Sequence, residues 1–170
     1  MKNCQLTIPS VLFAGQGSVE KLDAIIAREN AKHVLIFTDK GIRGLGLSKP
    51  AEDICSKHAE VTVIEDLTAE PAVGDIERVL AEVKSQPDLI VGIGGGSVMD
   101  AAKLASIIVG ADYTLRDLLK DSSIAHKQTK TVMLPTTCGT GSEATCNAIV
   151  AIPEQESKQG IVNDCMIPDY

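Results

Sequence analysis

The chain has 170 residues, of which 44% are hydrophobic and 23% are charged, a composition typical of one folded domain. Its net charge of −7 argues against binding to nucleic acid or to an anionic membrane surface through charge. No apolar run reaches 18 residues and residues 1–10 do not resemble a signal peptide, so we expect a cytoplasmic protein without a membrane partner.

The first part of the chain, residues 5–13, contains Pro9 and predicts an extended N-terminal arm that forms an edge strand or a hairpin. Beyond it, short apolar runs alternate with segments of helical period. This alternation predicts the α/β class, with a Rossmann-like, doubly wound, mainly parallel sheet and helices on both faces. The runs expected to be strands are 33–38, 61–64, 88–91 and 131–134, and apolar residues share one helical face in 19–26 and in 73–83.

The end of the chain departs from this alternation. After Thr145 the pattern predicts two short strands around a charged turn at 154–158, and residues 166–170 indicate no closing helix. We therefore expect residues 1–170 to form one α/β domain that is truncated before a further domain.

The strongest chemical signal is GIGGGSVMDAAK at 92–103, directly after the expected strand 88–91. The glycines at 94–96 permit positive φ and close backbone approach, and a helix that begins at Ser97 directs its N–H groups toward the loop. This arrangement predicts an anion site for a pyrophosphate. Ser97 and Asp100 also form an S-x-x-D capping pair, so a helix start without any ligand is the alternative.

An acidic residue precedes this glycine loop, whereas the usual dinucleotide fingerprint places the acid about twenty residues after it. Asp39 lies at the carboxyl end of the expected strand 33–38, where ligands of open α/β sheets bind. Its carboxylate can accept hydrogen bonds from ribose hydroxyls and would repel a 2′-phosphate, which favours NAD over NADP. A turn residue without a ligand is the alternative.

A second loop, LPTTCGTGSEAT at 134–145, again follows an expected strand. Its small residues and hydroxyls suit the sugar or phosphate of a cofactor. Ser142 and Glu143 are a poor nucleophile and base, because no histidine is nearby in sequence and the G-x-S-x-G pattern is absent.

Several of these segments occur in an order that resembles the iron-containing (group III) alcohol dehydrogenase family: TDKG at 38–41, EP at 70–71, GGGSVMDAAK at 94–103 and PTTCGTGSEAT at 135–145. The resemblance runs from about residue 8 to the last residue. It implies an N-terminal α/β domain that binds NAD(P) and a C-terminal all-helical domain that binds Fe(II) or Zn(II). It also implies hydride transfer between a primary alcohol, or its aldehyde, and nicotinamide, and a homo-oligomeric enzyme.

The resemblance also implies a role for individual residues. Asp39 matches an acid at the adenosine ribose, and Lys158 matches a lysine at the nicotinamide ribose, with a solvated turn lysine as the alternative. Thr145 and Asn147 match contacts to the nicotinamide half. The remaining predicted cofactor contacts are Pro71, the loop residues Gly95, Gly96 and Ser97, Asp100, and the threonines Thr136, Thr137 and Thr140.

The metal ligands implied by the resemblance, one aspartate and three histidines, lie beyond the last residue. His33, His58 and His126 have no convincing ligand partners at helical spacing, and the five cysteines form no C-x-x-C pair. We therefore expect no catalytic or metal-binding residue in this chain, and no turnover by the chain alone. The alternatives are a relative such as a zinc glycerol dehydrogenase or a sugar-phosphate cyclase, or a nucleotide-binding protein without catalysis.

Overall fold

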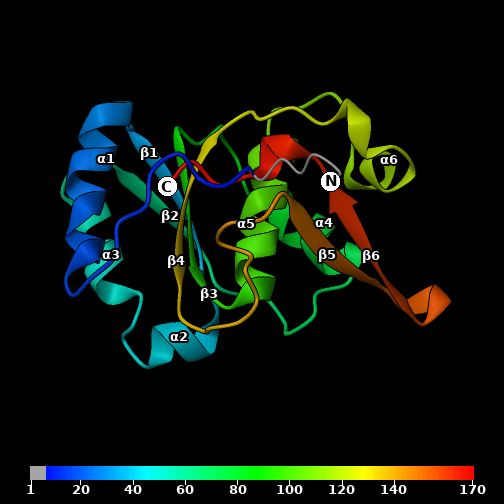
Figure 1. The fold of residues 1–170 in the computed structure, drawn as a ribbon, viewed down its shortest axis with the longest axis horizontal. Coiled ribbons are helices and arrows are strands. Elements are labelled where there is room, and N and C mark those ends of the chain that lie inside the picture. The colour runs from blue at the N-terminus through cyan, green and yellow to red at the C-terminus, as the bar shows by residue number, and fades with distance from the viewer. Residues whose placement is uncertain (1–6) are drawn as a thin grey trace, which may run out of the picture.

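Four parallel strands in the order β2-β1-β3-β4 form the centre of the computed structural model, which describes residues 7–170 (Figure 1). They are β1 (His33–Phe37), β2 (Glu60–Ile64), β3 (Leu89–Gly94) and β4 (Lys130–Pro135). All four expected strands are confirmed, and β3 continues three residues past the predicted end. The two central strands, β1 and β3, are continuous apolar runs because both of their faces are covered, whereas the edge strand β2 has one buried residue, Ile64.

Helices cover the two faces of the sheet, as the sequence predicted. On one face, at the left of Figure 1, α1 (Lys21–Glu29) and α3 (Lys49–Ser56) pack against Val34 and Ile36 of β1. On the other face, α4 (Val73–Ala81) and α5 (Gly96–Ile108) pack against the side chains of β1 and β3 that point the opposite way. Two shorter helices, α2 (Lys40–Gly44) and α6 (Leu115–Lys120), lie in the connections.

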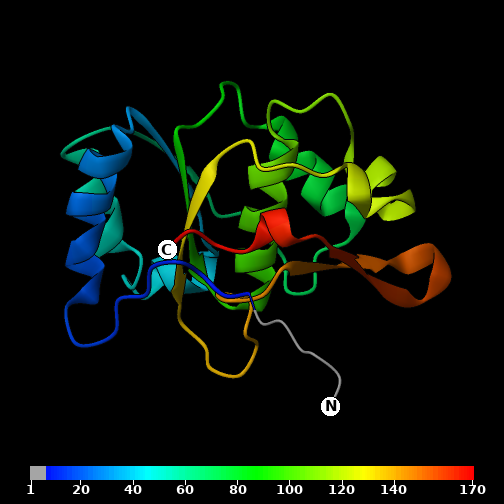
Figure 2. The same ribbon diagram turned by 45° about the horizontal axis from the view of Figure 1, so that its top comes forward.

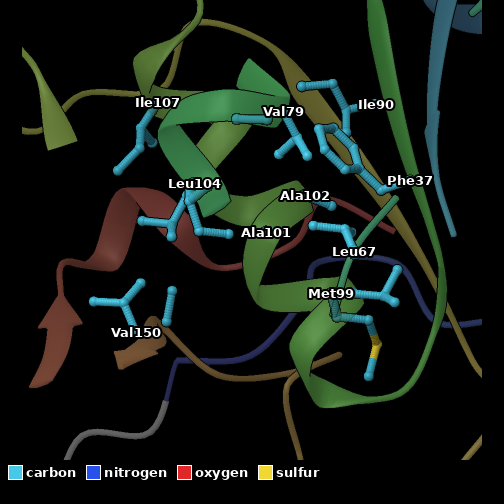
Figure 3. Close-up of a cluster of buried hydrophobic side chains, with 14 of the residues drawn as sticks. Phe37, Leu67, Val79, Ile90, Met99, Ala101, Ala102, Leu104, Ile107 and Val150 are labelled. Carbon is cyan, nitrogen blue, oxygen red and sulfur yellow. The ribbon is translucent and has the colours of Figure 1, made fainter. Parts of the chain in front are cut away.

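Helix α5 is buried on almost every side, because a second small sheet covers the side that faces away from the strands. Ten successive residues of α5, from Val98 to Ile107, are buried. The covering sheet is the antiparallel pair β5 (Asn147–Ile152) and β6 (Ser157–Val162), which confirms the two short strands predicted after Thr145. Val150 of β5 belongs to the same apolar cluster as Leu104 of α5 (Figure 3).

The N-terminal arm differs from the prediction. Residues 7–13 form neither a strand nor a hairpin, and Leu12 is 81% exposed; residues 5 and 6 lie outside the described part. The reason is that the edge of β4 is already bonded by the end of the chain, where Tyr170 N–H donates to the Thr131 carbonyl and Met133 N–H to the Tyr170 carbonyl. The arm runs beside this terminal segment in both views (Figures 1 and 2).

Among residues 7–170, no helix has the length and apolar character needed to cross a membrane.

Candidate functional site

The sheet changes its winding direction between β1 and β3. The chain leaves β1 toward β2 through α2 and α3, and leaves β3 toward β4 through α5, which lies on the opposite face from α3. In open α/β sheets, the carboxyl ends of the strands at such a point form a crevice that binds ligands. Asp39 follows β1 and the glycine loop follows β3, so both predicted signals flank this crevice.

The glycine loop and the threonine-rich loop start side by side. The parallel register pairs Gly94 with Pro135, the last residues of β3 and β4, and Thr136 N–H donates to the Gly94 carbonyl at 3.0 Å. Two loops from different parts of the sequence are therefore brought to the same edge of the sheet.

A pocket of about 470 Å³ lies at this edge. Six of its lining residues are predicted cofactor contacts: Asp39, Gly95, Gly96, Ser97, Thr136 and Thr137.

A second pocket, of about 300 Å³, adjoins the first, because Gly96 and Ser97 line both. The predicted residues that line the second pocket but not the first are Pro71, Asp100, Thr140, Asn147 and Lys158. Thr145 lines neither pocket and lies instead in a third one, of about 570 Å³, which also touches Asn147. The N-terminus of α5 is thus the point where the first and second pockets meet.

The start of α5 is not the one predicted from the S-x-x-D pattern. The helix begins at Gly96, Gly95 is its N-cap in an extended conformation, and no side chain caps it. Ser97 Oγ instead accepts a hydrogen bond from the Glu70 amide at 3.3 Å. The first N–H groups of a helix have no intrahelical acceptors. The end of α5 that meets both pockets is therefore the positive end of a 13-residue helix.

Within the glycine loop, Gly94 and Gly96 are required for space rather than for positive φ. Among the glycines of the two loops, positive φ occurs at Gly139 and Gly141. A Cβ atom on Gly96 would lie 3.1 Å from Thr140 Cγ2, so the two loops touch at this point.

Asp39 is half-buried and has a structural role besides lining the first pocket. Its Oδ1 accepts a hydrogen bond from Ile42 N–H at 2.8 Å, which makes Asp39 the N-cap of α2. The turn interpretation and the ligand interpretation are therefore compatible, because the capping bond uses one of the two carboxylate oxygens.

Lys158 lies in β6, and its side chain is 50% exposed. Its Nζ is 2.6 Å from Glu70 Oε1, so the two side chains form an ion pair, and both residues line the second pocket. This contact places a cation beside the pocket, on the far side from Asp39.

Asp100 is buried, and its carboxylate bonds to the protein. Oδ1 accepts from Ser142 Oγ at 2.7 Å, and Oδ2 accepts from Ile149 N–H at 2.9 Å. Lys103, one turn further along α5, lies 3.0 Å from Asp100 Oδ1 and is 0% exposed. Lys103 is not among the residues predicted from the sequence, although a D-x-x-K pair inside an otherwise apolar helix is a visible signal for a buried ion pair.

Among the described residues, no group of three or more His, Cys, Asp or Glu side chains is placed to hold a metal ion. His33 bonds to Thr62 Oγ1 at 2.9 Å, and His58 pairs with Asp23 on α1. Residues 7–170 therefore do not fit the metal that the resemblance implies.

Comparison with known proteins agrees with this geometry. A long-chain-alcohol dehydrogenase 1 of Geobacillus thermodenitrificans is 28% identical over 99% of this chain and 44% of its own length. A mitochondrial hydroxyacid-oxoacid transhydrogenase of Caenorhabditis elegans is 31% identical over 94% of this chain and 36% of its own length. The crystal structure of sulfoacetaldehyde reductase from Bifidobacterium kashiwanohense in complex with NAD+ superposes with a TM-score of 0.88 and 26% identity, over 99% of this chain and 45% of that one.

The chain thus spans less than half the length of these relatives. The family described as iron-containing alcohol dehydrogenase matches residues 9–170. The resemblance read from the sequence motifs is confirmed, and the chain belongs to the iron-containing alcohol dehydrogenase family.

Proposed function

We propose that residues 1–170 are the cofactor-binding domain of an NAD-linked alcohol dehydrogenase or aldehyde reductase. The observation that carries the proposal is the pair of adjoining pockets that meet at the N-terminus of α5. A dinucleotide has the matching layout, with two nucleoside halves joined by a pyrophosphate. NAD+ bound to the Bifidobacterium structure supports the same class of ligand for this chain.

The pyrophosphate lies at Gly95, Gly96 and Ser97 in this proposal. The chain carries a net charge of −7, so attraction to an anion has to be local. The N–H groups and the dipole at the start of α5 supply that local attraction. Glycine at 96 lets the ligand approach the backbone, because a side chain there would also meet Thr140.

The adenosine half occupies the first pocket, beside Asp39, Thr136 and Thr137. A carboxylate accepts hydrogen bonds from the two ribose hydroxyls and repels a phosphate at the 2′ position. This chemistry favours NAD over NADP.

The nicotinamide half occupies the second pocket, beside Pro71, Asn147 and Lys158. Thr145 contributes from the adjoining pocket. Bound NAD supplies the carbon that exchanges hydride with an alcohol or aldehyde. The residues of this chain bind the cofactor and orient it, and none of the described residues carries a step through a metal. We propose that the 170-residue chain binds NAD and does not turn over alone, and that the whole protein uses Fe(II) or Zn(II). A primary alcohol or aldehyde substrate, a cytoplasmic location and a homo-oligomeric state stay predictions.

The test is a titration of the purified chain with NADH, followed by the fluorescence of the reduced nicotinamide. The chain has no tryptophan, so the signal is free of tryptophan emission. We expect saturable binding, loss of binding in Gly96→Val, and unchanged binding in Gly74→Ala, where an added Cβ meets nothing within 4 Å. A folded chain that does not bind NADH would overturn the proposal, as would equal binding by Gly96→Val.

A further inference from the structure

Lys103 is a lysine with no exposure to solvent in the middle of helix α5. Moving an ammonium group out of water is costly unless hydrogen bonds and an opposite charge compensate it. Burial is the largest influence on this group and lowers the pKa of Lys103, while the neighbouring Asp100 opposes that effect. Because a buried lysine is costly, we expect Lys103 to make contacts that an apolar side chain at this position could not make.

The Lys103 ammonium binds main-chain oxygens as well as Asp100. It donates to the carbonyl of Asn147, in a short contact, and to the carbonyl of Thr145 at 3.5 Å. Both carbonyls belong to the start of β5 and the loop before it. An apolar side chain of the same length would leave these oxygens without their donor.

Asp100 binds the same segment at two further points, the Ser142 hydroxyl at 2.7 Å and the Ile149 amide at 2.9 Å. Two side chains of one helix turn therefore hold the segment 142–149 at four positions. Residues 142–146 contain no helix or strand, and Gly139 and Gly141 adopt positive φ just before them. The ion pair is the main polar attachment between this irregular segment and α5.

The attachment uses the main-chain carbonyls of Thr145 and Asn147. Their side chains remain available to line pockets, and Asn147 lines the second pocket. Thr136 and Thr137 of the first pocket are outside this network and instead follow directly from β4.

We infer that Asp100 and Lys103 are positioning residues, a buried ion pair that fixes the backbone of residues 142–149 and thereby orients the wall of the pocket for the nicotinamide half of the cofactor. This inference rests on the proposed function. It replaces direct cofactor contact as the main role of Asp100, and it assigns a role to Lys103.

The test separates the two halves of the ligand. Affinity is measured for NADH and, separately, for ADP, which contains the adenosine half and the pyrophosphate. The informative variant is the double substitution Asp100→Asn with Lys103→Met, because it removes both charges together and leaves no uncompensated buried ion. Circular dichroism and a thermal melt establish that the variant is folded.

We expect the double variant to bind NADH about tenfold more weakly and ADP within about twofold of the wild type. The fluorescence maximum of the bound NADH should also shift toward that of free NADH. The milder variant Ser142→Ala removes a single attachment with less risk to folding. It should weaken the affinity for NADH by about threefold and leave the affinity for ADP nearly unchanged.

Lys127→Met is the matched control. Lys127 is partly buried, pairs with Asp169 at 2.9 Å and, like Lys103, donates to a main-chain carbonyl, that of Ile167 at 2.6 Å, but it lines neither pocket. Its loss should change stability and leave both affinities unchanged.

If the folded variants lose affinity for NADH and for ADP to the same extent, the ion pair has a general structural role and the inference is overturned. Unchanged NADH affinity in both the double variant and Ser142→Ala would also overturn it. If the wild-type chain binds ADP and NADH equally well, the nicotinamide half makes no contact and the inference fails while the nucleotide site stands. If the wild type binds neither, the proposed function fails and the inference falls with it.

Discussion

Gly94, the last residue of β3, lies directly beneath Val98 in the first turn of α5. A Cβ atom on Gly94 would be 2.8 Å from Val98 Cβ and from Val98 Cγ2, which is closer than real Cβ contacts occur. The helix therefore packs tightly on the strand that precedes it, and this packing brings the N-terminus of α5 to the crevice between β1 and β3.

Gly94→Ala should destabilise the chain by about 1–3 kcal/mol, because the β-branched Val98 cannot move away easily in a packed core. Gly74→Ala should leave stability unchanged or raise it by about 0.5 kcal/mol, since the added methyl group is unobstructed in helix α4. Urea denaturation of both variants checks this difference. Equal stabilities would mean that β3 and α5 are not so closely packed.

Asp39→Asn should raise the affinity for NADPH relative to NADH by about tenfold. Asparagine keeps an oxygen that can accept the capping hydrogen bond from Ile42 N–H, so helix α2 is retained while the negative charge is removed. The measurement is a pair of fluorescence titrations for each protein. An unchanged NADH to NADPH ratio would exclude Asp39 as the residue that discriminates the 2′-phosphate.

The cysteines of residues 7–170 should differ strongly in reactivity. Cys55 is buried in α3, and burial raises the pKa of its thiol to about 11, so almost no thiolate is present at pH 8. Cys138 is exposed in the threonine-rich loop. Brief alkylation followed by peptide mass mapping should find label on Cys138 and none on Cys55 until the protein is unfolded. Early labelling of Cys55 would contradict the packing of α3 on the sheet.

Asp88 should make the free energy of unfolding depend on pH in the acidic range. Its Oδ2 accepts hydrogen bonds from the amides of Lys32 and His33 at 2.8 and 2.9 Å, and these bonds hold the pKa of Asp88 below its usual value of 3.8. A lowered pKa in the folded state gives a stabilisation that is complete above the unfolded pKa and is lost as the pH falls through the folded pKa.

Asp88→Asn should therefore reduce stability by about 1 kcal/mol at pH 7, a modest value because the carboxylate is exposed. The difference from the wild type should shrink as the pH falls below about 4. Denaturant melts at pH 7 and pH 3 test this. Other carboxylates also have lowered pKa values, and the comparison with the variant isolates Asp88. A difference that does not depend on pH would contradict the assignment.

The regular part of the fold was predictable from the sequence because the central strands of a covered parallel sheet are apolar runs, such as residues 89–91 of β3. The position of Asp39 and Gly96 at the same edge of the sheet was also predictable, because both residues follow an apolar run and the carboxyl ends of parallel strands lie at one edge. Each of these inferences needs only local sequence and one rule of topology.

The other features depend on contacts between distant segments. Asp100 was a plausible helix cap by its spacing from Ser97, but its partners are Ser142 and Ile149, over forty residues away. The arm at 7–13 was predicted to be an edge strand or a hairpin, yet the edge of β4 that it would join is bonded by Tyr170. Such competition for one partner is decided by the tertiary structure and leaves no local pattern.

The most direct test of the cofactor site is an amide-resolved NMR titration of the chain with NADH. The largest shifts are expected at Asp39, Gly95 to Ser97, Thr136, Thr137 and Lys158, along the two pockets that meet at α5. A larger pocket of about 640 Å³ lies between α4, α6 and the tip of the β5–β6 hairpin, and it should be unaffected. Shifts confined to that larger pocket, around Gly74, Arg116 and Glu154, would contradict the proposed site.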